Sequence, residues 1–511
     1  MSEDISLQDI LYPELVFGLV GPIGVNMDDV QSSLSDALSQ VGYKAKVIHL
    51  TQLLKKYEQD LHGPKQQTIY ADKIATANAF CSTAKNGAAM AALAISEIRA
   101  IRRAQPAVEG ENDASRSRRA MPKTAFIVRQ LKREEEVDLL RSVYGAKFIQ
   151  ISVSLDKDSR IENLKNRLSK EHPGLSADDC ERSARELVTI DEHQLDEDGS
   201  QTDFGQQVGD IFHLGDFFVD GSDAGKIAVA TQNFIRAFFG NNRISPTIDE
   251  FGAYLAAAAA LRSVDLSRQV GAAILNKHGD IVSMGCNEVP KAGGGNYWQD
   301  DDPRFRDIER GSEQNSVERQ RIIVDFFQKL QSSGLINSQT SLDTPEMKEK
   351  LEDAVEDALI ADITEYGRMT HAEMSAICDA ARLGRALQGM TLFVTTFPCH
   401  NCAKHIVASG IVRVVFVEPY PKSRAPSSHT DSISVGSPTC RKVAFEHFQG
   451  ISPKRYRDIF HKGKRRKGSN ILKWYEEEPR PRIQQRDNLH VQKEAFAVNS
   501  TLAELENPNK E

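Results

Sequence analysis

The stretches THAEMSAICDA (Thr370–Ala380) and TLFVTTFPCHNC (Thr391–Cys402) decide how the C-terminal half of this chain folds. The first stretch has the apolar spacing of a helix, and the second begins with a short apolar run typical of a strand. A second helix is expected from Cys399 to Ser409, followed by the strand-like run VRVVFV. His371 and Cys399 therefore stand at the starts of two expected helices.

One histidine and two cysteines have the spacing of a zinc site with an open position. Cys399 and Cys402 stand at i and i+3 in the first turn of one helix, so both thiolates can face a single metal ion. His371 adds an imidazole from the other helix. Three protein ligands leave the fourth tetrahedral position to water, which is typical of a catalytic zinc rather than a structural one. One bound Zn²⁺ would lower the pKa of that water toward about 7.

Glu373 is the expected proton shuttle. It follows the ligand His371 by two residues, so its carboxylate projects beside the metal and can carry a proton from water to a ring nitrogen and to departing ammonia. The order H-x-E…P-C-x-x-C is that of zinc nucleobase deaminases. A thioredoxin-like redox pair would not call for the upstream H-x-E. A structural zinc would need a fourth ligand, and residues 291–370 contain neither Cys nor His.

The composition of the chain limits the class of protein that can carry this site. The chain has 511 residues, of which 40% are hydrophobic and 27% charged, as expected of a globular protein with two to four domains. Its net charge of −8 argues against a generally basic surface for coating nucleic acid. Seven scattered cysteines do not form a disulfide framework. No signal peptide or membrane-spanning run is recognised, so we expect a cytoplasmic protein.

The N-terminal half alternates strands and helices. Strand-like runs at Leu15–Val20, Lys44–Leu50, Thr124–Gln130 and Lys147–Leu155 are separated by helical patterns. This alternation predicts a doubly wound parallel sheet.

Three regions follow from the composition along the chain. We expect one α/β domain over residues 1–240 and a second domain over residues 246–450 with an insertion at 291–370. Residues 451–511 read as a basic C-terminal extension and flexible tail.

Over roughly residues 246–445 the chain resembles the deoxycytidylate deaminases. The resemblance rests on GAAILNKHGDIVSMGCNEVP, THAEMSAICDA and TLFVTTFPCHNCAKHIVASGIVRVVFVEPYPKS. It implies a three-layer α/β/α cytidine-deaminase fold and hydrolysis of the C–N bond that holds the 4-amino group of a deoxycytidine nucleotide, a cyclic amidine. It also implies that Asn287 contacts the sugar, and that Tyr420, Lys422 and Arg424 handle base and phosphate. A turn-forming role for Asn287 and a plain surface role for the two cations are the alternatives.

The start of the chain resembles a P-loop kinase such as a deoxynucleoside monophosphate kinase. The stretch is GLVGPIGVNMDD, in which Gly21 and Gly24 remain. Asn26, Met27 and Asp28 stand where the motif has glycine, lysine and a hydroxyl residue. Because the lysine that neutralises phosphate is missing, we interpret the domain as a degenerate, regulatory one.

Most of the chain resembles the bacterial anti-phage dCTP deaminases, in which a P-loop kinase-like domain is fused to a deoxycytidylate deaminase domain. LKREEEVDLLRSVYGAKFIQISVSLDKDSRIENLKNRL and FGQQVGDIFHLGDFFVDG extend the match. The resemblance implies antiviral defence by zinc-dependent conversion of dCTP, and of dCMP, to deoxyuridine nucleotides. A homo-oligomer is usual for the fold. The sequence does not separate dCTP from dCMP.

Two other functions stay open on the sequence alone. An editor of RNA or single-stranded DNA would carry the same zinc core but needs a basic, aromatic-lined groove. The run KGKRRKG, with Lys464, Arg465, Arg466 and Lys467, is a candidate for binding a regulatory RNA or a phosphate-rich ligand. A catalytically silent, nucleotide-sensing protein is the third possibility, which the intact Glu373 disfavours.

Overall fold

The computed structural model divides the chain into two compact units. The first unit comprises Met1–Glu250 and Gln449–Glu511, and the second comprises Phe251–Phe448. The structure describes residues 11–57, 68–192, 205–336, 344–355, 358–363, 365–436, 441–473, 479–483 and 487–506. None of the described helices is long and apolar enough to cross a membrane.

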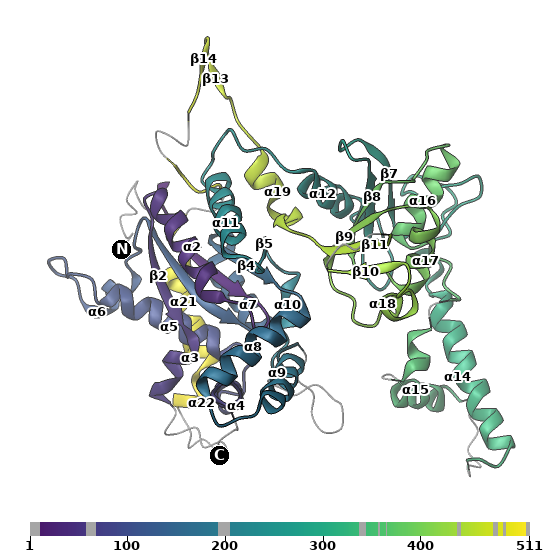
Figure 1. Ribbon diagram of the computed structural model, residues 1–511, viewed down its shortest axis with the longest axis horizontal. Helices are drawn as coiled ribbons and strands as arrows, with labels where there is room; N and C mark the ends of the chain where they lie inside the picture. Colours follow the sequence, from purple (N-terminus) through teal and green to yellow (C-terminus); the bar gives the residue numbers. More distant parts are fainter. Residues whose placement is uncertain are drawn as a thin grey trace. The chain divides into compact units, whose positions relative to one another are not determined.

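The first unit is built around a central sheet covered by helices (Figure 1). The sheet has six strands in the order β12-β5-β4-β1-β3-β2. Strands β1 to β5 run parallel, and β12 is antiparallel to β5. Every residue of β1 is buried, as expected of a strand covered on both faces. The strand bounds are β1 Leu15–Val20, β2 Lys44–His49, β3 Thr124–Leu131, β4 Phe148–Ser154, β5 Phe217–Asp220 and β12 Gly450–Ile451.

Alternate residues of β1 point into two separate cores. Leu15, Phe17 and Leu19 pack with α2 and α11, whereas Val16 and Val20 pack with α5 and α7. The helix bounds of this unit are α2 Met27–Gln40, α3 Leu50–Leu53, η1 Leu54–Lys56, α4 Ile69–Thr83, α5 Ala89–Arg103, α6 Asp113–Arg118, α7 Glu134–Tyr144, η2 Gly145–Lys147, α8 Lys157–Glu171, α9 Ala177–Glu192, α10 Val208–Phe212 and α11 Ala224–Phe238.

The C-terminal segment differs from the predicted flexible tail. It contains α19 (Pro453–Phe460), the hairpin β13 (Arg466–Lys467) and β14 (Asn470–Ile471), α21 (His490–Thr501) and α22 (Ala503–Glu506). Val498 and Leu502, one helical turn apart, are buried in the same core as α5 and α7. Polar residues surround the few apolar ones of α21, so the sequence alone does not indicate its buried face.

Buried charges also tie α21 into the first unit. Arg102 is fully buried and pairs with Glu14 at 2.7 Å and with Glu494 of α21 at 2.5 Å. His490, also in α21, lies 3.1 Å from the Glu14 carboxylate. Because a lone buried charge is costly, each of these groups needs the others in place.

The second unit contains another six-stranded sheet, in the order β10-β11-β9-β8-β6-β7. The strands β10, β11, β9 and β8 are parallel, while β6 and β7 are antiparallel to their neighbours. The bounds are β6 Gly271–Leu275, β7 Ile281–Cys286, β8 Thr391–Thr396, β9 Arg413–Glu418, β10 Ile433–Val435 and β11 Val443–His447.

Helices cover both faces of this sheet, which gives three layers. A Cβ on Gly271 would lie 2.0 Å from the Ala256 carbonyl oxygen of α12 (Ile248–Ala260), so α12 packs closely on that face. The next residue of β6, Ala272, shares a core with α16 (Ala372–Arg382) and α17 (His400–Ala408) on the other face. The arrangement agrees with the expected mixed α/β architecture of this half.

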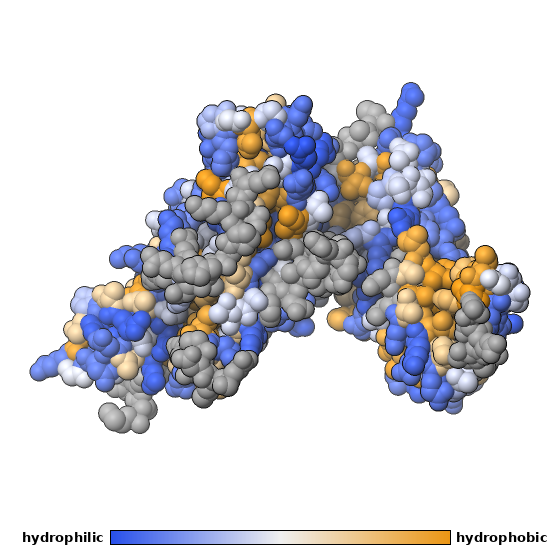
Figure 2. Space-filling model, turned by 90° about the horizontal axis from the view of Figure 1, so that it is seen from below, coloured by the Kyte–Doolittle hydropathy of each residue, from blue (hydrophilic) through white to orange (hydrophobic). Residues whose placement is uncertain are grey.

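The insertion forms helices of its own. They are α13 (Asp307–Arg310), α14 (Gln314–Ser332), α15 (Pro345–Ala354) and η3 (Leu359–Asp362). Ile323, Val324 and Leu351 form a small core between α14 and α15. Figure 2 shows apolar side chains gathered over these helices, and Phe326, Leu335 and Leu359 are each at least half exposed.

Candidate metal centre

His371, Cys399 and Cys402 converge on one point in the second unit. Their ligand atoms all lie within 4.8 Å of one another. The Nδ1 atom of His371 is 3.4 Å from the sulfur of Cys399 and 3.4 Å from that of Cys402. One imidazole and two thiolates suit Zn²⁺, and within the described part of the chain the group has three members. A fourth position is therefore left for water or substrate.

The protonation of these groups is strongly coupled. The Cys402 thiol donates a hydrogen bond to the Cys399 sulfur, which lowers the pKa of Cys399 to about 3. The same hydrogen bond and burial raise the pKa of Cys402 well above its ordinary value. The contact with Cys399 raises the pKa of His371 to about 9. A divalent cation replaces these protons, because thiolate and neutral imidazole are the ligating forms.

Glu373 lies beside the three ligands and is only 4% exposed. Burial raises the pKa of its carboxyl group, and the nearby His371 lowers it by a smaller amount. Its carboxylate also forms a hydrogen bond with Cys402. A buried carboxyl with a raised pKa can both accept and donate a proton near neutral pH.

The backbone positions both helix starts. His371 is the N-cap residue of α16 and Cys399 is the N-cap residue of α17. The residue before His371, Thr370, forms a two-bond bridge with Glu288 after β7. Gly285 of β7 lets α16 approach, because a Cβ there would lie 2.3 Å from the Ala372 carbonyl oxygen. The ligands are therefore held by the sheet rather than by a mobile loop.

The two cysteine ligands, Cys399 and Cys402, follow a turn that is fixed at the end of β8. Phe397 donates its backbone N–H to the Glu418 carbonyl at 2.8 Å, and the Ser423 hydroxyl donates to the Pro398 carbonyl at 2.8 Å. The turn before Cys399 is thus held by β9 and by the loop that follows it. These bonds keep the Cys399 and Cys402 thiolates in front of His371.

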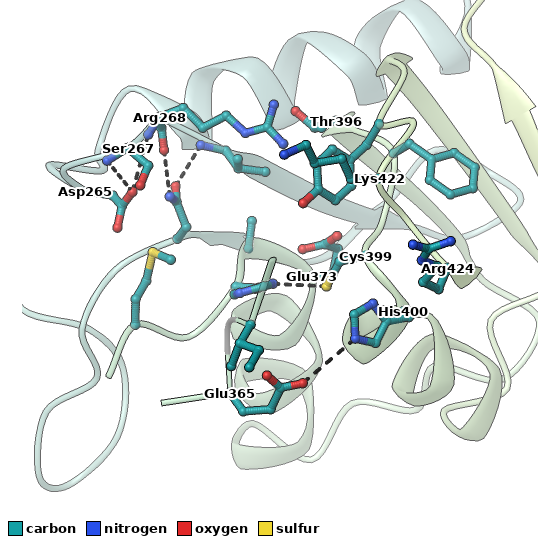
Figure 3. A pocket seen from close by; sticks show the side chains of 18 of the residues that line it. Asp265, Ser267, Arg268, Glu365, Glu373, Thr396, Cys399, His400, Lys422 and Arg424 are labelled. Atoms are coloured by element: carbon teal, nitrogen blue, oxygen red, sulfur yellow. Dashed lines mark hydrogen bonds and ion pairs between the residues drawn. The ribbon is translucent and has the colours of Figure 1, made fainter. Parts of the chain in front are cut away.

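A cavity of about 400 Å³ opens onto the metal ligands (Figure 3). It is lined by His371, Glu373 and Cys399, and by residues of the loops around them. The insertion contributes Leu359, Ile363, Glu365 and Met369. A cavity of this size takes a small molecule. The sequence does not indicate that the insertion lines this cavity, because the residues of the insertion contain no recognisable motif.

Asn287 lies at this cavity with its amide group already engaged. Its Oδ1 accepts the Val270 backbone N–H at 2.7 Å, and its Nδ2 donates to the Arg268 carbonyl at 2.7 Å. The side chain thus fixes the segment that leads into β6. The amide group keeps one hydrogen and one lone pair for a further partner.

The other expected substrate contacts, Tyr420, Lys422 and Arg424, also line the cavity. The structure adds Arg268, which the sequence analysis did not single out. Its guanidinium lies 5.1 Å from the centroid of the Tyr420 ring and pairs with Glu418 at 2.8 Å. In Figure 3, Arg268 and Lys422 lie on the side of Glu373 opposite Glu365. Two cations therefore lie on this side of the cavity, where Asp265 lines it as well.

His400 lies within the C-x-x-C motif but faces Glu365 rather than the metal ligands. Its Nε2 is 4.0 Å from the Glu365 carboxylate across the cavity, as Figure 3 shows. His400 is absent from the converging group of ligand atoms in the described part of the chain. It is therefore a cavity residue supported by the insertion.

Gly21 and Gly24, the glycines of the expected degenerate P-loop, have packing roles in the first unit. A Cβ on Gly24, whose φ is +95°, would lie 2.6 Å from the Arg160 carbonyl of α8. A Cβ on Gly21 would lie 2.2 Å from the Met27 side chain. Asp28 pairs with Arg129 at 2.5 Å. The loop thus packs tightly, and none of these contacts supplies the missing phosphate-binding lysine.

The basic run lies on a small exposed hairpin. Arg466 and Lys467 form β13, which pairs with β14, and all four residues of the two strands are exposed. Lys464 and Arg465 precede them and are also exposed. The hairpin therefore presents its cations to solvent.

Comparison with known proteins assigns the domain that carries the site. Residues 247–418 match the cytidine and deoxycytidylate deaminase zinc-binding region. The deoxycytidylate deaminase of Enterobacteria phage T4 is 48% identical over 54 residues, which are 11% of this chain and 28% of that protein. That of Pongo abelii is 27% identical over 168 residues, 33% of this chain and 63% of that protein.

These matches are partial. The chain spans less than a third of the length of the phage relatives it matches. Among solved structures, the dCMP deaminase of cyanophage S-TIM5 in complex with dCMP and dUMP is 16% identical, with a TM-score of 0.23 over 40% of this chain and 98% of that one. The second unit thus carries a deaminase-type zinc-binding region.

Proposed function

We propose that the second unit is a zinc-dependent hydrolase that removes the 4-amino group of a deoxycytidine nucleotide. The observation that carries the proposal is the convergence of His371, Cys399 and Cys402 beside the buried carboxyl group of Glu373. The match of residues 247–418 to the deaminase zinc-binding region supports it.

The residues of the site divide the chemistry between them. His371, Cys399 and Cys402 would hold Zn²⁺, which when bound supplies Lewis-acid activation of water. Glu373 accepts a proton from the attacking water on its carboxylate and donates it to N3 of the cytosine ring. A second proton passes through the same carboxylate to the departing amino group, so that water is consumed and ammonia leaves a uracil ring behind.

The rest of the cavity recognises the nucleotide. We assign Asn287 to the sugar and Tyr420 to the base. Arg268, Lys422 and Arg424 supply the cations that phosphate oxygens require. These cations support a substrate that carries phosphate, although Arg268 is already paired with Glu418. From the resemblance to the anti-phage dCTP deaminases, we propose dCTP as the preferred substrate and dCMP as a second one.

The substrate assignment is tested with the purified, zinc-loaded full chain. It is incubated separately with dCTP, dCMP, cytidine and a cytosine-containing oligonucleotide, and ammonia and uracil products are followed. Turnover of dCTP above that of dCMP is expected. Turnover of the oligonucleotide alone would make the protein an editor of nucleic acid. Absence of turnover of all four compounds by the zinc-bound protein would contradict the proposal.

The biological role we propose is antiviral defence by depletion of the dCTP pool, with a degenerate P-loop kinase-like first unit that regulates the deaminase. The support is the resemblance of both halves to the anti-phage dCTP deaminases. Cells that carry the gene should lose dCTP on phage infection and yield fewer phage. Cells with the Glu373→Ala variant should behave like cells without the gene, and equal protection by this variant would contradict the role.

A regulatory RNA is a second proposed partner, because the basic hairpin exposes Lys464, Arg465, Arg466 and Lys467. Binding of a labelled RNA should weaken steeply as salt rises, since phosphate contacts release counterions. Replacing the four cations with Gln should remove most of that salt-dependent binding. Unchanged binding would exclude the hairpin as the contact.

We also propose that the protein is a homo-oligomer through the helices of the insertion. Phe326 is 51% and Leu335 is 75% exposed there, and apolar side chains gathered at a surface are typical of an interface. Light scattering should give a multiple of the chain mass of 56.7 kDa. The double variant Phe326→Ser/Leu335→Ser should lower that mass, and a monomeric wild type would contradict the proposal.

A further inference from the structure

The insertion builds one wall of the cavity that opens onto the metal ligands. This insertion wall consists of the lining residues Leu359, Ile363, Glu365 and Met369. The other lining residues lie in or next to the central sheet, α16 and α17. Because the insertion wall comes from outside the sheet, the insertion takes part in selecting the molecules that fit the cavity.

Asn315 of α14 holds the backbone of the insertion wall. This residue is 6% exposed, and its side-chain amide donates to the Ile363 carbonyl at 2.8 Å. Its Oδ1 accepts the Tyr366 backbone N–H at 3.3 Å. One turn later on α14, Arg319 donates to the Ala361 carbonyl at 3.0 Å. Both ends of the Asn315 amide are therefore engaged in holding the insertion wall against α14.

Apolar packing fixes the insertion wall from behind. Ile360, which follows Leu359 in η3, packs against the small core between α14 and α15. Because Ile360 is packed there and Asn315 holds the backbone beyond it, the insertion wall is a fixed part of the fold rather than a free loop.

The charges that line the cavity are divided between its sides. The charged lining residues outside the metal centre are Asp265, Arg268, Glu365, Lys422 and Arg424. In Figure 3, Arg268 and Lys422 lie on the side of Glu373 opposite Glu365, and Asp265 lies on the side of Arg268. An anionic group thus meets two cations on one side of the cavity and a carboxylate of the insertion wall on the other.

The insertion wall offers a phosphate group little to bind. Within the described part of the chain, it brings neither lysine nor arginine to the cavity lining. The Glu365 carboxylate lies 4.0 Å from Nε2 of His400, so this imidazole already faces a carboxylate. The side chains of Leu359 and Ile363 carry no hydrogen-bond donor. A phosphate needs cations or donors, and a nearby carboxylate repels it.

The two sides of the cavity match the two ends of a nucleotide. In a DNA or RNA strand, every inner nucleotide carries phosphate on both its 5′ and its 3′ oxygen, and these two groups leave the sugar in different directions. A free nucleotide such as dCTP carries its phosphates on the 5′ oxygen. A cavity with cations on one side and a carboxylate on the other therefore suits the free form.

We propose that Glu365 is a specificity-determining residue that rejects cytosine nucleotides with a phosphate on the 3′ oxygen, and that Asn315 is the positioning residue that holds it there. The inference rests on the proposed deaminase function. It places the 5′-phosphates toward Arg268 and Lys422 and the 3′-hydroxyl toward Glu365. The cavity thus accepts free nucleotides and excludes a cytosine inside a strand.

The test is calorimetric titration of the zinc-loaded full chain with dUMP, the product expected from dCMP, and with deoxyuridine 3′,5′-bisphosphate. The wild type should bind dUMP at least about tenfold more tightly than the bisphosphate. Glu365→Gln should reduce this preference by at least about fivefold, because it removes the repulsive charge and keeps the shape of the side chain. The matched control is Glu349→Gln, an exposed glutamate of α15 outside the cavity, which should keep the wild-type preference.

Asn315→Ala tests the positioning role with the same two ligands. It should also reduce the preference for dUMP, because the backbone of the insertion wall loses two hydrogen bonds. Equal weakening of both ligands with an unchanged preference would show that Asn315 acts on the fold alone and would overturn its positioning role.

The outcome does not depend on turnover, since neither ligand carries the 4-amino group. Failure of the proposed function would appear separately, as zinc-loaded wild type that releases no ammonia from dCTP. Equal affinity of the wild type for the two ligands, absence of dUMP binding, or an unchanged preference in Glu365→Gln would overturn the inference.

Discussion

At Cys399 and Cys402 the chain brings two thiols within hydrogen-bonding contact of each other and of His371. The motif itself indicated these residues, because ligands at i and i+3 in a helix and one imidazole on a second helix form a local pattern. The lining of the cavity around them could be predicted from the sequence only in part. Arg268 is far from the motif in sequence and reaches the cavity only through the fold.

Replacing one thiolate should empty the metal centre. Cys399→Ser should lower the zinc content, measured by inductively coupled plasma mass spectrometry, from about one ion per chain to a small fraction, because three ligands already form the minimum set. Cys378→Ser is the matched control, since Cys378 is an exposed cysteine of α16 outside the site. Full zinc content in the Cys399 variant would show that the ligand set is wrong.

Arg268 should act on substrate binding. Arg268→Gln is expected to raise the KM for dCTP by about tenfold or more with a smaller change in kcat, because a charged hydrogen bond to phosphate is lost. Steady-state ammonia release measures both constants. Lys277→Gln, an exposed lysine between β6 and β7, should leave them unchanged. A fall in kcat at constant KM would instead give Arg268 a role at the reacting atoms.

At the scale of elements, close helix-to-sheet contact holds the site. Gly285 of β7 and Gly271 of β6 let α16 and α12 approach opposite faces of one sheet. The sequence predicted the helices and strands of this half from their apolar spacing. It did not predict that β6 pairs with both β7 and β8, because strand order depends on contacts between distant segments.

Gly285→Ala should therefore disturb the metal centre from a distance. The added Cβ would lie 2.3 Å from the Ala372 carbonyl oxygen, so α16 must shift away from the sheet. We expect a loss of about 1–3 kcal/mol of stability and a lower zinc affinity. Thermal unfolding and competition with a chelator measure the two effects. Gly174→Ala, where a Cβ meets nothing within 4 Å, serves as control. Wild-type zinc affinity in Gly285→Ala would contradict this account of how α16 is held.

At the scale of the whole chain, the buried cluster of Glu14, Arg102, Glu494 and His490 joins segments that lie far apart in sequence. His490 and Glu14 are 476 positions apart and 3.1 Å apart in space. No local pattern indicates such a pair, and the sequence alone therefore predicts a flexible tail for the C-terminal segment. The parallel sheet of the first unit was predictable, because it rests on repeated local alternation.

This cluster should make the first unit sensitive to acid. Burial raises the pKa of Glu14, but Arg102 and His490 outweigh it and lower the pKa from 4.5 to about 2. A lowered carboxyl pKa stabilises the fold above pH 4.5, and that stability is lost as pH falls toward 2. Burial also lowers the pKa of His490, so its protonation below pH 6.5 favours the unfolded chain.

The expected result is a lower unfolding midpoint for Glu14→Gln than for the wild type at pH 7, with the difference shrinking as pH falls from 4.5 toward 2. Breaking a buried pair costs about 3–5 kcal/mol when the partner stays unpaired. Circular dichroism on thermal unfolding across that pH range measures the difference. A difference that stays constant with pH would show that Glu14 is not ionised in the folded chain.

The central claim is that Glu373 moves protons at a zinc centre held by His371, Cys399 and Cys402. The most direct test measures zinc content and ammonia release from dCTP in the wild type and in Glu373→Gln, which keeps the shape of the side chain but cannot carry a proton. We predict about one zinc ion in both proteins and a rate lower by at least about a hundredfold in the variant. Full turnover in Glu373→Gln with zinc bound would contradict the account.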